Sequence, residues 1–114
     1  MAERIERDLE RKLVGRKVTW MNVGLDIDEA VEQEGLEVAC FSEYEHSYDN
    51  TEVVKALTTD GRIIAVTVEW EEWREHGRIT DVFVSDPIKP EEYPTPEEFP
   101  CWREVMTIAS IRKR

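Results

Sequence analysis

The chain has 114 residues, of which 36% are charged and 40% are hydrophobic, and its formal net charge is -11. This length suits one domain with one core, and the four Trp residues argue against a disordered chain. The acidity disfavours direct binding to nucleic acid or to anionic membranes, because both require clustered Lys and Arg.

The charge is unevenly distributed along the chain. Residues 21–101 contain 21 acids and five bases, whereas residues 1–20 and 102–114 each carry a net positive charge. The acidity of the middle segment either keeps a small protein in solution or attracts a basic partner, and the sequence leaves both interpretations open.

The first segment has the spacing of an amphipathic helix. Ile5, Leu9 and Leu13 recur every four residues among charged neighbours, and Gly15 marks the expected end. Because the apolar stripe is narrow, we expect this helix to lie on a sheet and not to be enclosed by it.

The spacing of the apolar side chains changes in the next segments. Residues 16–23 form a β-like run, and residues 26–35 indicate a short helix. Over residues 36–49 apolar and aromatic side chains fall mostly at even positions, while Phe41 shares the odd positions with the acids. We therefore expect a strand with one apolar face and one acidic face.

A meander of strands follows. Residues 52–58 and the run that begins at Ile64 are β-branched, and Asp60-Gly61 between them is a strong hairpin signal. In the second run Ile64, Val66, Val68 and Trp70 should face the core. We expect His76-Gly77 to close that strand, and residues 79–85 to form one more with Val82 and Val84 inward.

All five prolines lie within Asp86–Pro100, which predicts an extended, acidic surface segment. Beyond it, Trp102, Val105, Met106 and Ala109 have helical spacing. We expect a short C-terminal helix over residues 101–111, and the β-branched residues there keep a final strand as the alternative.

Together these elements predict an α+β fold, a single domain over residues 1–114. An N-terminal helix packs on a twisted antiparallel sheet of four to five strands. A helix followed by a meander of long strands resembles cystatin-like architecture, and a helix leading into five strands also resembles Sm-like barrels. The resemblance is one of layout, and no family motif is matched residue by residue.

One candidate binding surface surrounds a tryptophan. Strand parity places Trp73 on the side of acidic residues, where an indole would suit an interface anchor and the carboxylates would steer a basic surface. The competing interpretation tucks Trp73 under a helix or the Pro-rich segment. The predicted partner-binding residues are Glu69, Glu71, Glu72, Trp73 and Glu75, with Glu43 and Glu45 as neighbours across the sheet.

The alternative site is a pocket lined by Tyr44, His46 and Tyr48, which alternate along one strand face. Histidine can transfer protons near neutral pH, so a catalytic or small-molecule site could form there. Alternating aromatics are equally typical of any half-buried strand, and we expect no catalytic site.

The sequence predicts no cofactor and no metal site. Glu72 and His76 could share a helical face, but the chain has two histidines and a metal usually needs three or four ligands. The run at residues 26–29 begins like a calcium loop, yet it lacks the glycine and the final glutamate at their offsets, so helix N-terminal acids explain it better.

The leading functional hypothesis is a non-enzymatic, acidic protein-binding module. It would engage a basic, nucleic-acid-binding surface of a partner protein, as an inhibitor of the immunity, antitoxin or anti-defence type that mimics phosphate charge. The alternatives are the small-molecule or catalytic domain above and a structural homodimer that associates through a strand edge.

The start of the chain has no apolar leader, and no run is long enough to cross a bilayer. These features predict a cytoplasmic location without membrane contact. There Cys40 and Cys101 would remain reduced.

Overall fold

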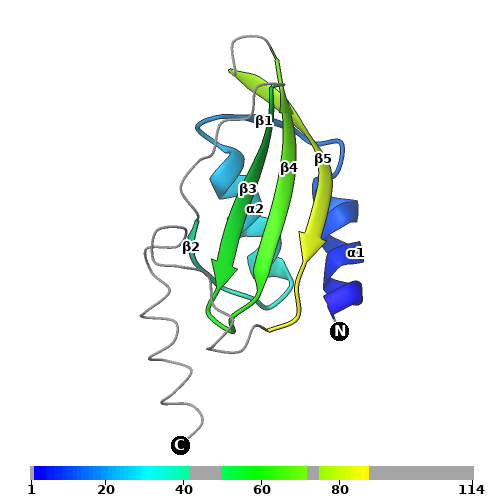
Figure 1. Cartoon of the computed structure of the whole chain (residues 1–114), viewed down its shortest axis with the longest axis vertical. Coiled ribbons are helices and arrows are strands. Elements are labelled where there is room, and N and C mark those ends of the chain that lie inside the picture. Colours follow the sequence, from blue (N-terminus) through cyan, green and yellow to red (C-terminus); the bar gives the residue numbers. More distant parts are fainter. Residues whose placement is uncertain (1, 42–49, 72–74, 88–114) are drawn as a thin grey trace, which may run out of the picture.

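Two helices cover one face of an antiparallel sheet (Figure 1). The structure is a computed structural model and describes residues 2–41, 50–71 and 75–87. Within them the sheet has five strands in the order β1-β5-β4-β3-β2, which confirms the predicted α+β fold. The elements are α1 (Ala2–Leu13), β1 (Lys17–Thr19), α2 (Val23–Gln33), β2 (Val38–Phe41), β3 (Thr51–Thr58), β4 (Ile63–Trp70) and β5 (His76–Val84).

The core lies between the helices and the inner face of the central strand β4. Ile64, Val66 and Val68 are fully buried, as their alternation predicts. Burying each such side chain contributes about 1.5 to 3 kcal/mol relative to leaving it in water. The intervening side chains of β4 consequently face the opposite, outer side of the sheet.

The helices present apolar side chains four residues apart. Leu9 and Leu13 of α1 are fully buried, as predicted. Helix α2 begins at Val23, three residues earlier than the sequence indicated, because Val23 and Ile27 are both buried on its inner face. An ion pair of 2.8 Å between Lys12 Nζ of α1 and a carboxylate oxygen of Glu34, directly after α2, links the two helices.

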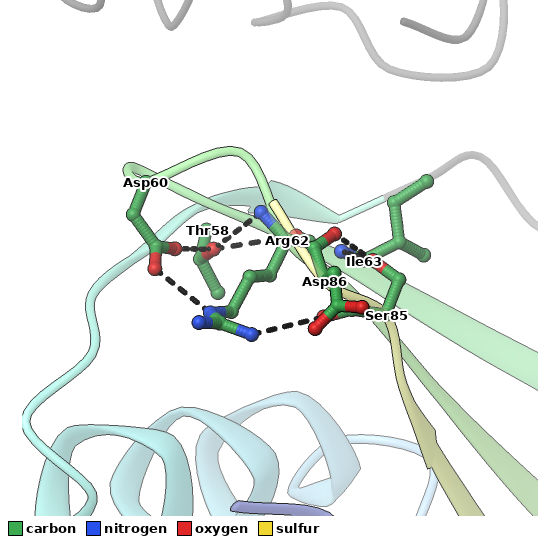
Figure 2. A network of polar contacts seen from close by, with 6 residues as sticks. All are labelled: Thr58, Asp60, Arg62, Ile63, Ser85 and Asp86. Carbon is green, nitrogen blue, oxygen red and sulfur yellow. Dashed lines mark hydrogen bonds and ion pairs between the residues drawn. The ribbon is translucent and has the colours of Figure 1, made fainter. Parts of the chain in front are cut away.

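The predicted turn at Asp60-Gly61 joins β3 to β4, and Gly61 has a positive φ of 87°. Figure 2 shows the polar network around it. Arg62 donates to Asp60 Oδ2 at 3.0 Å and to the carbonyl of Ser85 at 3.2 Å, while the Thr58 hydroxyl donates to Asp60. The network therefore ties the end of β5 to the β3–β4 turn.

Trp70 closes one end of the core. It is 5% exposed, and its indole Nε1 donates to Glu52 Oε2 at 3.0 Å. A Cβ on Gly77 would come within 2.7 Å of the Trp70 ring. His76 and Gly77 were expected in a turn, but both lie in β5, where glycine is needed because the indole lies over it.

Strand β2 departs from the predicted alternation. A register shift between Val38 and Cys40 lets both Val38 and Phe41 pack against the core. The sequence had placed Phe41 on the acidic face, which is wrong because strict parity does not anticipate a bulge. Residues 42–49 lie outside the described part of the chain.

The described portion of the chain ends at Pro87. The predicted C-terminal helix at 101–111, and all but the first two residues of the Pro-rich segment Asp86–Pro100, therefore lie outside it. Among the described helices, none combines the length and the apolar character that crossing a membrane requires.

Cys40 is disulfide-bonded, whereas the sequence favoured a reduced thiol. The other cysteine of the chain is Cys101, which lies outside the described residues. Disulfides persist in oxidising compartments and are rare in the cytosol.

The first prediction concerns Trp70. Trp70→Phe keeps an apolar ring but removes the donor to Glu52, whose other oxygen, Oε1, has no hydrogen-bond partner among the described residues. We expect the free energy of unfolding, measured by urea denaturation, to fall by about 1 to 3 kcal/mol. Trp20→Phe is the control, because Trp20 is largely exposed; an equal loss in both variants would contradict the role of the buried hydrogen bond.

The second prediction concerns the disulfide. Peptide mapping of the native chain without reductant should recover a peptide that joins Cys40 to Cys101. Reduction should lower the free energy of unfolding by about 2 to 4 kcal/mol, because the bond restricts the unfolded chain. Recovery of two free thiols from protein isolated with rapid alkylation would refute this pairing.

Candidate functional site

The structure describes three of the predicted partner-binding residues, namely Glu69, Glu71 and Glu75, and all three are exposed. The others lie outside the described residues: Glu43, Glu45, Glu72 and Trp73. The three residues of the alternative pocket, Tyr44, His46 and Tyr48, lie outside them as well.

Glu69 and Glu71 face the outer side of the sheet, but they do not form a purely acidic platform. Strand register places Arg78 of β5 directly opposite Glu69, and Lys17 of β1 directly opposite Arg78. Together with His76, these side chains line a shallow groove of about 460 Å³. Cations across neighbouring strands offset part of the local negative charge, so this surface is mixed in sign.

A second shallow groove, of about 420 Å³, adjoins the first at His76. Its walls include Trp20, Met21, Glu75 and His76. The Trp20 and Met21 side chains are 63% and 69% exposed, which is unusual for such large apolar groups.

Local backbone bonds explain why these two side chains face water. Strand β1 ends at Thr19, and the amide of Asn22 donates to the Thr19 carbonyl at 3.1 Å and to its hydroxyl at 3.2 Å. The resulting turn carries Trp20 and Met21 away from the sheet. Sequence reasoning missed them because it extended the β-like run to residue 23; the polar Asn22 before a helical period was the available signal.

Helix α2 provides the most uniformly acidic described surface. Its sequence contains four acids and no base. Leu25, Asp28, Glu29 and Glu32 recur at helical spacing, and all four are exposed. We call these four residues the α2 acidic face. Sequence reasoning treated this stretch only as a short helix.

The charges around α2 divide into paired and unpaired groups. Asp26 binds Arg16 at 3.2 Å and Glu34 binds Lys12 at 2.8 Å. No ion pair between described residues involves Asp28, Glu29 or Glu32. Within the described part of the chain, the negative potential of the α2 acidic face is therefore not offset by an ion pair.

No group of three or more potential metal ligands occurs among residues 2–41, 50–71 and 75–87. The calcium-like run at 26–29 lies inside α2, as the helical interpretation predicted. His76 lies in β5, while Glu72 is outside the described ranges.

A separate acidic group lies where α1 approaches β5. Burial, followed by the carboxylates of Glu10, Asp81 and Glu3, raises the pKa of Glu6 above its ordinary value of 4.5. Ionised Glu6 is therefore mildly unfavourable in the folded state. The described ion pairs include none of these four carboxylates.

Comparisons with known proteins do not identify the chain, since no family model, curated protein or solved structure gives a significant match. The exposed side chains and grooves of the described residues are therefore the basis for a functional proposal.

The third prediction follows from the raised pKa of Glu6. Because the folded state favours the protonated acid, its stability should fall as the pH rises from about 4.5 through the raised pKa of Glu6. Glu6→Gln removes this penalty and should be more stable than the natural chain at pH 7. Since Glu6 is partly exposed, we expect a gain of a few tenths of a kcal/mol.

The measurement is urea denaturation at several pH values between 4 and 8. The exposed Glu37, in the loop before β2, supplies the matched control Glu37→Gln. A Glu6→Gln advantage that is as large at pH 4 as at pH 7 would rule out the electrostatic explanation.

Proposed function

We propose that this chain is a non-enzymatic protein-binding module that engages a basic surface of a partner protein. One observation carries the proposal: three large apolar side chains, Trp20, Met21 and Leu25, are each about two-thirds exposed. Leu25 belongs to the α2 acidic face and follows Trp20 and Met21 closely in the chain.

The apolar residues supply affinity in this proposal. Neighbouring exposed apolar side chains that are rimmed by polar groups are typical of interaction sites. Trp is enriched among interface hot spots, and Met is enriched at interfaces in general. Trp20 and Met21 share their groove with the polar residues Glu75 and His76. A partner that covers this groove would bury both anchors.

The carboxylates supply orientation and association rate. Asp28, Glu29 and Glu32 are exposed on one helix and form no ion pair with another described residue, so they would attract a surface rich in Lys and Arg. Such surfaces commonly bind nucleic acid. The proposal therefore includes an inhibitor of the immunity, antitoxin or anti-defence type that occupies a nucleic-acid-binding surface, with no direct binding of nucleic acid by this chain.

The proposed binding surface differs from the one that the sequence suggested. The sequence placed its centre on the sheet, around Glu69, Glu71 and Trp73. The cations opposite Glu69 make the sheet a weaker candidate, and we assign Glu71 and Glu75 to the rim. The centre of the proposed surface is the turn at Trp20 and Met21 together with the α2 acidic face.

The fourth prediction tests this assignment by measuring binding to the partner protein. That partner is first isolated by affinity capture with this chain and is then purified. Trp20→Ala should weaken binding at least tenfold, because it removes a central anchor. Replacing Asp28, Glu29 and Glu32 together by Gln or Asn should mainly slow association and reduce its salt dependence. Calorimetry and stopped-flow mixing at two salt concentrations provide these values.

Val53→Ala is the matched control, because Val53 is an exposed apolar residue on the outer face of the sheet. It should leave the affinity within about twofold, as surface changes away from a binding site usually do. An affinity that does not respond to salt, or that Trp20→Ala leaves unchanged, would exclude the proposed mode of binding.

A further inference from the structure

Strand β5 is longer than the strand that covers its outer edge. β1 pairs only with His76, Gly77 and Arg78. The backbone before β1 adds two hydrogen bonds to Ile79: the Gly15 amide donates to the Ile79 carbonyl at 2.8 Å, and the Ile79 amide donates to the Arg16 carbonyl at 3.1 Å. Over Thr80–Val84 no described strand pairs with β5 on this side.

An uncovered edge presents unpaired amides and carbonyls, and it can accept a further strand. Figure 1 shows α1 alongside this half of β5. A strand added here would therefore pair with β5 along one edge and would lie close to α1. One face of that strand would point toward α1, and its other face would join the outer side of the sheet.

The charges along this position are negative. Asp81 lies on β5, and Glu3, Glu6 and Glu10 lie on α1; after burial, the carboxylates of Glu10, Asp81 and Glu3 contribute to the raised pKa of Glu6. Phe83, on the outer side of the same edge, is 53% exposed. A cationic strand would relieve the repulsion, and its apolar side chains could cover Phe83.

The same charges argue against a second copy of this chain at the edge. Pairing β5 with another β5 would bring further carboxylates into a site where no ion pair between described residues involves Asp81, Glu3, Glu6 or Glu10. Native proteins use charged residues to prevent such edge-to-edge association.

We propose that the edge of β5 at Thr80–Val84 accepts an extended segment of a partner protein, with Lys or Arg alternating with apolar residues. The segment adds a sixth strand to the sheet. Its cations face the acids of α1, and its apolar residues, on the opposite face of the segment, lie next to Phe83 on the outer side of the sheet. This surface is separate from the turn at Trp20 and from the α2 acidic face, so the proposal extends beyond the function proposed above.

The fifth prediction uses a synthetic probe, an acetylated and amidated hexapeptide of alternating valine and lysine. Titration followed by backbone amide NMR should shift the resonances of Thr80–Val84 and slow their hydrogen exchange about tenfold at saturation. Asp81→Asn and Glu6→Gln should each weaken binding roughly two- to fivefold. Two control peptides should leave the β5 resonances unchanged. One alternates valine with glutamate, and the other is the valine–lysine peptide with its backbone amides N-methylated, so that it lacks the hydrogen-bond donors of a strand.

Several outcomes would overturn this proposal. Resonance shifts confined to α2 or the Trp20 turn at millimolar peptide would mean that charge alone captures the probe there. Equal binding of the N-methylated peptide would exclude strand addition. In the absence of peptide, the amides of Thr80–Val84 could be protected from hydrogen exchange and lose that protection on dilution. Together with a dimer seen by light scattering, this result would assign the edge to a second copy.

Discussion

The rest of the structure depends on the burial of one face of the sheet beneath α1 and α2. Once Ile64, Val66 and Val68 of β4 must face the helices, the period of two sends every intervening side chain to the other side. Trp70 completes this inner row, and its indole requires both a hydrogen-bond acceptor, Glu52, and a glycine beneath the ring. Core packing thereby determines which polar groups can reach a partner.

The short strand β1 explains why two different surfaces remain available. Because β1 ends at Thr19, the turn that follows carries Trp20 and Met21 into water before α2 begins. Because β1 begins only at Lys17, the last part of β5 also pairs with no described strand on that side. Both proposed binding surfaces thus follow from the same three-residue strand.

Net charge alone did not locate the negative surface. The central segment is strongly acidic, but the fold distributes its carboxylates among different environments. Glu69 lies across from Arg78, and Asp26 and Glu34 bind cations that precede them in the chain. Glu52 is buried under Trp70. Asp28, Glu29 and Glu32, in contrast, are exposed on α2 and form no ion pair among the described residues, which is the physical basis of the proposed attraction to a basic surface.

The sequence by itself determined the α+β class, the first helix, the hairpin at Asp60-Gly61 and the inward row of β4, because these follow from periods of 3.6 and 2 and from local turn chemistry. It could not give the bulge in β2, the glycine beneath Trp70 or the opposition of Arg78 to Glu69, since each depends on which distant strand lies alongside. Exposure of Trp20 also depended on where β1 ends. Local pattern reports which residues prefer burial, whereas tertiary pairing decides which side chains meet and which remain free.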